Sequence, residues 1–335
     1  MGFRIRRSIT LMPGVRVNLS PSSVGLTVGG KYARTTINSR TGVRRSYSIP
    51  GTGISYTSRP TRPETHGRGT VRVAPPQPVP AQAAAPAPSL FAGRGEKELY
   101  AALTHGRYAD LEPIASRHPE VRMTCMLVDA FHTPDTPESY RRLRGMFEEL
   151  WTSGYDPERD AFVTKYAWAS TATVGLAPGV SVTLPLHRPA IGLALAELRQ
   201  ENGDLVEAAD LVETLEPSVP AAVSLAELYG LLERWAAVVE LTEQVTGHDE
   251  LSTFLLVQRA AALRELGHHV AAREVLRPVL GRKTVPPELR HLALLQRALS
   301  YAAEGKKPQA RRDLEKILAE DGRFPGLTEA MAELR

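Results

Sequence analysis

The chain has 335 residues, of which 42% are hydrophobic, and a formal net charge of +4. This length accommodates two or three domains with hydrophobic cores of their own. The single cysteine excludes an internal disulfide framework and any zinc site built from several cysteines. No run of 18 apolar residues occurs, and no apolar signal-peptide core follows the basic start. We therefore expect no transmembrane segment and a cytoplasmic location.

Basic and acidic residues are distributed very unevenly. The first 63 residues contain eleven arginines and lysines and no aspartate or glutamate, and the residues up to Gly95 sum to a charge of +13. The remainder, residues 96–335, carries about −9. A basic segment joined to an acidic body bears on the choice of partners, and does not identify a reaction.

Residues 2–58 have the period of short strands. Apolar and polar residues alternate in several runs, and turn signals such as Pro13-Gly14 and Pro50-Gly51 recur every eight to twelve residues. The alternating apolar residues are Val15, Val17 and Leu19, then Val24, Leu26 and Val28, with Phe3/Ile5 and Tyr47/Ile49 in shorter runs. The pattern predicts a small antiparallel all-β module over residues 1–59, with arginines mostly on its polar face.

Three sequence blocks in this segment resemble a known family. Met1–Ser8, Pro13–Ser20 and Ile49–Tyr56 occur in the order found in the small bacterial family called domain of unknown function 4236. The resemblance covers about the first 57 residues. It implies a compact β module and brings no known activity, cofactor or catalytic residue.

Residues 60–93 contain eight prolines and seven alanines. Such a composition cannot form a core and favours extended polyproline conformations. We expect a flexible linker that tethers the β module to the rest of the chain.

Residues 94–335 have helical periodicity and contain a repeat that averages 34 residues. A small residue precedes each turn position by seven residues, and another small or β-branched residue follows it by five. The preceding residues are Ala196, Ala226, Ala260 and Ala298; the turn positions are Gly203, Glu233, Gly267 and Gly305; the following residues are Ala208, Val238, Ala272 and Ala310. Small residues at these places allow paired helices to approach closely.

This layout resembles the tetratricopeptide repeat (TPR), clearest over residues 189–322. Some TPR positions differ, because the early aromatic of the first helix is absent and the later one survives only as Tyr229 and Tyr301. The resemblance implies an all-α, TPR-like domain of degenerate repeats, with Thr328–Leu334 as a capping helix.

Three further features are expected within this helical domain. Residues 96–154 have room for two earlier helical pairs, with Gly106 as a turn. Thr136-Pro137-Glu138 and Asp156-Pro157-Glu158 are typical helix starts. Residues 173–187 alternate apolar and polar and predict an inserted β-hairpin, in which Pro185 can lie only on an edge strand. The hairpin either covers a helix face or offers an edge that recruits another strand.

No motif in the sequence supports catalysis or metal binding. Gly25–Lys31 resembles a phosphate-binding loop but is followed by Tyr32 in a region of strands. The segment Asp156–Ala167 lacks the glycine and the glutamate of a calcium loop. His268 and His269 are adjacent and diverge on a helix, and Cys125 lies in an apolar run typical of a buried thiol. We expect no enzyme activity, no cofactor and no metal.

The sequence favours a non-catalytic adaptor. Its helical repeats would bind a protein or peptide, with groove residues from the first helices, namely Arg199, Tyr229, Arg264 and Tyr301. Its β module would dock on an anionic partner through Arg4, Arg6, Arg16 and Arg44. Two alternatives remain open: a nucleic-acid-binding protein whose repeats recruit other proteins, and an autoinhibited protein whose basic module folds onto its acidic repeats.

Overall fold

The computed structural model describes residues 87–134, 136–178, 180–246 and 249–334 with their side chains, together with the backbone of six strands that precede them. The linker residues 60–86 lie outside the described residues, so the predicted domain boundaries stay predictions. The chain divides into two compact units, Met1–Asn202 and Gly203–Arg335.

Five of the early strands form one antiparallel sheet, in which each strand pairs with the next along the chain. Arg16 lies opposite Thr27 in this register, and Arg44 lies opposite Thr36. The strands are β2 (Val15–Ser20), β3 (Ser23–Gly29), β4 (Ala33–Asn38), β5 (Gly42–Ser48) and β6 (Ser55–Thr57). The predicted apolar and arginine-bearing faces concern side chains outside the described residues.

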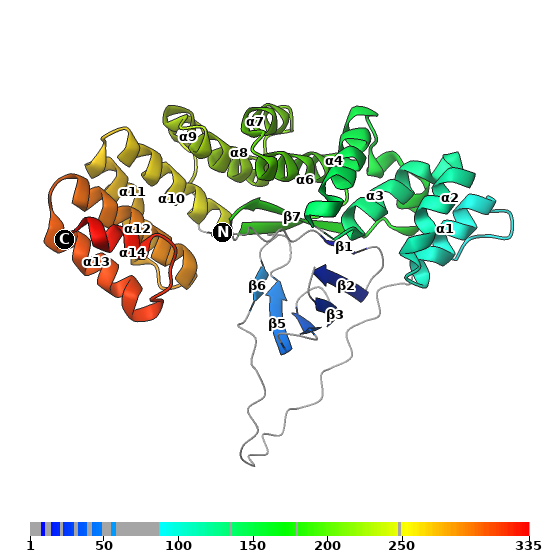
Figure 1. The fold of residues 1–335 in the computed structure, drawn as a ribbon, viewed down its shortest axis with the longest axis horizontal. Helices are drawn as coiled ribbons and strands as arrows, with labels where there is room; N and C mark the ends of the chain where they lie inside the picture. Colours follow the sequence, from blue (N-terminus) through cyan, green and yellow to red (C-terminus); the bar gives the residue numbers. More distant parts are fainter. Residues whose placement is uncertain are drawn as a thin grey trace, which may run out of the picture. The chain divides into compact units, whose positions relative to one another are not determined.

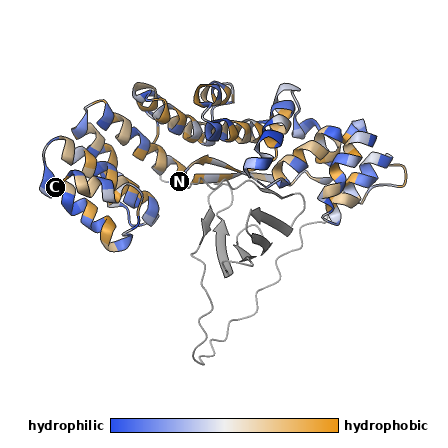
Figure 2. Ribbon diagram, viewed as in Figure 1, coloured by the Kyte–Doolittle hydropathy of each residue, from blue (hydrophilic) through white to orange (hydrophobic). Residues whose placement is uncertain are grey.

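The described helices of the first unit follow one another along the chain (Figure 1), and several of them contribute residues to one hydrophobic core. They are α1 (Arg94–Thr104), α2 (Leu111–Arg117), α3 (Arg122–His132), α4 (Pro137–Thr152), α5 (Ala161–Tyr166) and α6 (Arg188–Asn202), with short 3-10 turns at Tyr108–Asp110, Pro119–Val121 and Pro157–Arg159. Leu99, Leu111 and Val128 are among the buried residues of that core. Figure 2 shows hydrophobic and hydrophilic residues alternating around these helices, as expected for helices with one buried face.

Local signals in the first unit explain where its helices begin. Gly106 has φ +65°, which confirms the predicted turn. Thr136 caps α4, because its hydroxyl accepts from the Ser139 amide while the Ser139 hydroxyl accepts from the Thr136 amide. The predicted helix start at Thr136 is confirmed.

The predicted helix start at Asp156 is only partly right. Asp156 caps a single 3-10 turn, Pro157–Arg159, and the α-helix begins after Asp160. The Asp160 carboxylate accepts from the amides of Phe162 and Val163 at 2.8 and 2.9 Å. It also accepts from Thr124 at 2.7 Å, so a contact distant in the sequence helps to place the cap.

The predicted β-hairpin is present as β7 (Thr171–Ala177) and β8 (Val180–Pro185). Residues on β7 alternate in burial, and α6 packs against this strand. The first strand of the chain, β1 (Ser8–Thr10), pairs antiparallel with the other side of β7. The hairpin therefore both covers a helix and receives another strand. Pro185 lies on β8, an edge strand of the order β1-β7-β8, as predicted.

The second unit contains the helices of the predicted repeat that lie after Asn202, together with the terminal helix. They are α7 (Leu205–Glu213), α8 (Val219–Leu231), α9 (Trp235–Leu241), α10 (Glu250–Glu265), α11 (His269–Gly281), α12 (Pro287–Ala303), α13 (Lys307–Glu320) and α14 (Leu327–Glu333) (Figure 1). Helices α8/α9, α10/α11 and α12/α13 are consecutive packed pairs. The predicted capping helix is α14, and Leu327 and Ala330 on it are buried in the terminal core.

All four predicted turn positions have left-handed backbone conformations. The φ angles are +87° at Gly203, +81° at Gly267 and +73° at Gly305. Glu233 holds the same place with φ +56°, and it is the one residue other than glycine with positive φ in the described part of the chain. The left-handed conformation ends one helix and begins the next, which is why glycine suits three of the four turns.

The small residues on either side of each turn are all buried. Ala196, Ala226, Ala260 and Ala298 are at most 1% exposed, and so are Ala208, Val238, Ala272 and Ala310. Ala260 and Ala272 share one core between α10 and α11, and Ala298 and Ala310 share another between α12 and α13. The repeat inferred from spacing is thus confirmed as a helix-pair repeat.

Candidate functional site

The first helices of the pairs in the second unit lie next to one another, α8 beside α10 and α10 beside α12. Half-buried polar side chains connect them. Gln258 on α10 donates to the Glu227 carboxylate on α8 at 2.7 Å. Arg264 on α10 donates to the Gln296 side-chain carbonyl on α12 at 3.3 Å. We call Glu227, Gln258, Arg264 and Gln296 the polar ladder.

The two glutamines of the ladder occupy the same position of the repeat. Each lies two residues before the buried alanine of its helix, Gln258 before Ala260 and Gln296 before Ala298. Two residues rotate an α-helix by about 200°, so each glutamine points almost opposite to its alanine. The alanine faces the second helix of the pair, and the glutamine is left to reach the preceding first helix.

The charge of the polar ladder changes along its length, from a carboxylate at Glu227 to a guanidinium at Arg264. Burial raises the pKa of Glu227, although the hydrogen bond from Gln258 opposes that shift. Arg264 adds a positive charge further along, and its guanidinium also lies 2.6 Å from the carboxylate of its neighbour Glu265. The ladder thus combines a carboxylate, two side-chain amides and a guanidinium, which together can donate and accept several hydrogen bonds.

The sequence-predicted groove residues have separate environments. Arg199 lies on α6 of the first unit, with its guanidinium 4.0 Å from Glu148. The Tyr229 hydroxyl on α8 donates to Glu213 on α7 at 2.8 Å. The Tyr301 ring on α12 lies 4.7 Å from the guanidinium of Arg273 on α11. These two tyrosines contact the second helix of the preceding pair.

Of the predicted groove residues, only Arg264 belongs to the polar ladder. Sequence reasoning missed Glu227, Gln258 and Gln296. A detectable signal existed, because Gln258 and Gln296 stand at equivalent places in successive repeats. The assignment of Arg199, Tyr229, Arg264 and Tyr301 to a binding groove stays a prediction.

The four arginines assigned to an anionic partner cannot be placed in a site. Arg16 and Arg44 belong to β2 and β5, whose side chains lie outside the described residues. Arg4 and Arg6 lie outside them entirely. This assignment also stays a prediction.

The cysteine and the adjacent histidines considered in the sequence lie in places that suit a structural role. Cys125 is 1% exposed, and its burial raises the pKa of the thiol to about 12, as expected for a buried thiol. His268 and His269 lie at the start of α11, at the repeat turn, as predicted. Within the described ranges, no group of three His, Cys, Asp or Glu residues could hold a metal ion. No described helix is long and apolar enough to cross a membrane.

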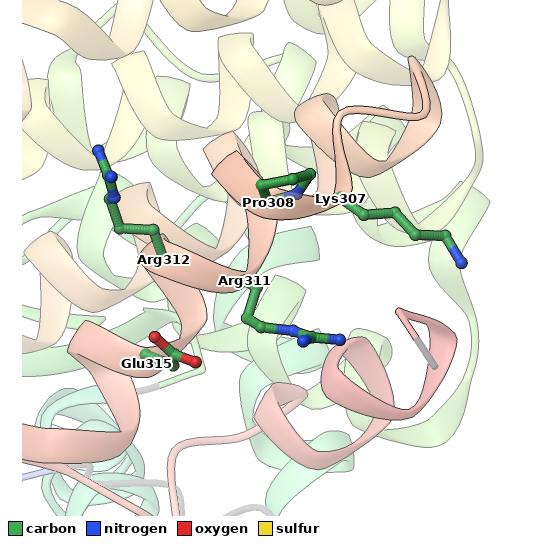
Figure 3. A pocket seen from close by; sticks show the side chains of 5 residues that line it. All are labelled: Lys307, Pro308, Arg311, Arg312 and Glu315. Carbon is green, nitrogen blue, oxygen red and sulfur yellow. The ribbon is translucent and has the colours of Figure 1, made fainter.

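Helix α13 carries a cluster of exposed cations on the second unit. Lys307, Arg311 and Arg312 line a shallow hollow together with Pro308 and Glu315. Figure 3 shows Lys307 and Arg311 extending to one side and Arg312 to another. Because these side chains diverge, they do not enclose a ligand.

Comparisons with known proteins cover different parts of the chain. Residues 3–57 match the family described as protein of unknown function DUF4236. This match confirms the resemblance inferred for the first 57 residues, and DUF4236 carries no described activity. A search of curated proteins finds no match.

A solved structure shares the helical fold. The N-terminal domain of the EccA1 ATPase from the ESX-1 secretion system of Mycobacterium tuberculosis matches with a TM-score of 0.51 and 15% sequence identity. The match covers 72% of this chain and 89% of that domain. At this identity the likeness concerns the fold alone, and it is compatible with a TPR-like arrangement.

Proposed function

We propose that this chain is a non-catalytic adaptor whose helical repeats bind a protein or peptide and whose basic segment docks on an anionic partner. The observation that carries the proposal is the polar ladder on α8, α10 and α12. The likeness to the EccA1 N-terminal domain is consistent with it, since this chain's own helices pack in consecutive pairs.

The ladder suits an extended peptide because of its hydrogen-bonding groups. A peptide backbone offers N–H donors and C=O acceptors along its length, and a glutamine side chain offers one acceptor and two donors. Gln258 and Gln296 are each half-buried, so they keep a fixed position while remaining accessible. Their spacing of one repeat allows a single peptide to meet both.

A peptide-display selection against the full chain tests the proposal. Selected peptides are measured by fluorescence anisotropy against wild type, a Gln258→Ala/Gln296→Ala variant and a Gln309→Ala control. Gln309 is an exposed glutamine on α13, so its loss removes the same group away from the ladder. We expect the ladder variant to weaken binding about tenfold or more, which corresponds to about 1.4 kcal/mol, and the control to bind normally. Peptides that bind all three proteins equally, or a selection that yields none, would contradict the proposal.

The anionic partner is proposed from the charge of residues 1–63 alone. An electrostatic complex should weaken steeply as salt rises. We expect retention of the full chain on duplex nucleic acid or anionic vesicles at low salt, and its loss when Arg4, Arg6, Arg16 and Arg44 are replaced by alanine. Retention on nucleic acid only would favour the nucleic-acid-binding alternative, and no retention on either would remove the anionic partner.

The autoinhibited alternative has one supporting observation of its own. Strand β1 of the basic segment pairs with β7, with Ser8 opposite Thr173. A Ser8→Cys/Thr173→Cys variant of the full chain should form a disulfide under mild oxidation, detected by mass spectrometry after proteolysis. A Ser8→Cys/Thr328→Cys variant is the control. Equal cross-linking in both variants would contradict a specific fold-back.

A further inference from the structure

A second polar hollow, of about 310 Å³, lies in the first unit and is unrelated to the ladder. The 3-10 turn before α2, the first turn of α2, the end of α3 and the first half of α4 contribute its walls. The titratable residues of its lining are Tyr108, Glu112, Asp129, His132 and Arg142. Ala109, Thr133 and Pro134 complete the lining.

The imidazole of His132 lines this hollow and keeps one hydrogen-bond acceptor. Its Nδ1 lies 2.8 Å from the Val128 carbonyl, and because a carbonyl only accepts, Nδ1 carries the proton. The lone pair is therefore on Nε2, which has no hydrogen-bond partner among the described residues. Burial lowers the pKa of His132 to about 4, so the ring is uncharged at neutral pH. The Tyr108 ring stacks on it with 3.8 Å between centroids, which fixes the orientation of the imidazole.

Two carboxylates share a single cation in the hollow. The guanidinium of Arg142 lies 2.5 Å from Asp129 and 3.5 Å from Glu112. Thr133 also donates to Asp129 at 3.2 Å. With His132 neutral, the group keeps one uncompensated negative charge. An anion would be repelled by the two carboxylates, and the only arginine among the described lining residues already pairs with both of them.

We propose that this hollow binds the cationic side chain, lysine or arginine, of a protein partner. A cationic head would donate to Nε2 of His132 and to the remaining lone pairs of Glu112 and Asp129, and it would neutralise the uncompensated charge. The face of the Tyr108 ring opposite His132 can add an electrostatic attraction for a cation. The site lies wholly within the first unit, so this proposal does not depend on whether the polar ladder binds a peptide.

Single amino-acid probes test the proposal on the full chain. N-acetyl-arginine amide and N-acetyl-lysine amide are titrated while the imidazole signals of His132 are followed by NMR, with N-acetyl-glutamine amide as the neutral control. We expect saturable shifts with a dissociation constant on the order of millimolar for one or both cations. The two arms show which cation the hollow prefers.

A matched pair of charge-removing variants locates the binding. Glu112→Gln removes one carboxylate from the rim, where 78% of the side chain is exposed, so folding is not at risk. Glu158→Gln makes the same change at an exposed position outside the hollow. We expect the first to weaken cation binding about fivefold or more and the second to leave it unchanged. No saturable shift with either cation, equal shifts with the neutral probe, or equal effects of the two variants would each overturn the proposal.

Discussion

Arg297 on α12 and Asp313 on α13 form a two-pronged ion pair within the last helix pair. The guanidinium Nε lies 2.7 Å from one carboxylate oxygen, and Nη2 lies 2.8 Å from the other. The Asp313 side chain is only 4% exposed, and Lys316 is its second cation at 3.4 Å. The pair therefore joins two helices at a place where an unpaired carboxylate would be costly.

Removing the arginine of this pair should destabilise the protein. Arg297→Ala leaves the buried Asp313 carboxylate with Lys316 alone, and we expect a loss of about 3 kcal/mol in the free energy of unfolding. Urea denaturation followed by circular dichroism measures it. Arg277→Ala is the control, because its pair with Glu274 is exposed and should contribute less than about 1 kcal/mol. Equal losses in both variants would show that the buried pair has no special role.

The strained turn at Glu233 should be improved by glycine. Its φ of +56° is costly for a residue with a side chain, whereas glycine adopts it freely. The relieved strain is partly offset because glycine makes the unfolded chain more flexible, so we expect Glu233→Gly to stabilise the chain by about 0.5–1 kcal/mol in thermal or urea denaturation.

The reverse change at an equivalent turn provides the control for Glu233. A Cβ at Gly267 would meet no atom within 4 Å, so Gly267→Ala tests the backbone angle alone. We expect Gly267→Ala to lower the free energy of unfolding by about 1 kcal/mol. If both substitutions change stability in the same direction, the left-handed angle is not the cause.

Cys125 should be unreactive in the folded protein. Burial raises the pKa of its thiol to about 12, so very little thiolate is present at pH 8. We expect modification by iodoacetamide to be at least ~100-fold slower in buffer than in denaturing urea, as measured by intact mass. Rapid labelling of the native chain would contradict the buried assignment.

His132 should make stability depend on pH in the mildly acidic range. Burial lowers its pKa to about 4 from an unfolded value of about 6.5, so the unfolded chain takes up a proton first as the pH falls. The stability contributed by the neutral ring is complete above pH 6.5 and is lost as the pH falls towards 4. We expect wild type to lose about 1–3 kcal/mol more than His132→Gln between pH 7 and pH 4.

The comparison between those two proteins isolates the histidine. Asp129, Glu112 and Arg142 face the same hollow in both, and burial raises the pKa of Asp129, which gives the opposite pH dependence. Their contributions cancel in the difference between urea denaturation curves. A difference that stays constant with pH would exclude His132 as the titrating group.

Much of the helical architecture could be predicted from local patterns. The turn positions Gly203, Gly267 and Gly305 were found from spacing because the left-handed backbone favours glycine. Glu233 was found only because the repeat required a turn there, since its own residue type gives no such signal. The hairpin and the cap at Thr136 were predictable for the same reason, as both depend on residues close together in the chain.

Contacts between distant residues could not be predicted. Asp160 caps α5 while its carboxylate accepts from Thr124, which is 36 residues away, whereas the local pattern favours a helix start at Asp156. Gln258 meets Glu227 across 31 residues, and Gln258 alone gives no sign of a partner. Caps and turns can be predicted because they depend on residues close together in the chain, whereas these two contacts depend on how separate helices pack.

The uneven charge, the strand-rich basic segment and the helix-pair repeat with its turns and small residues all follow from local patterns in the sequence. Three features come from the folded chain alone: β1 pairs with β7, polar side chains connect the first helices, and His132 shares a hollow with Asp129 and Arg142. The physical reason is that periodicity and backbone angles act over a few residues. Ladders, strand edges and hollows arise from packing between elements, which no single stretch of sequence encodes.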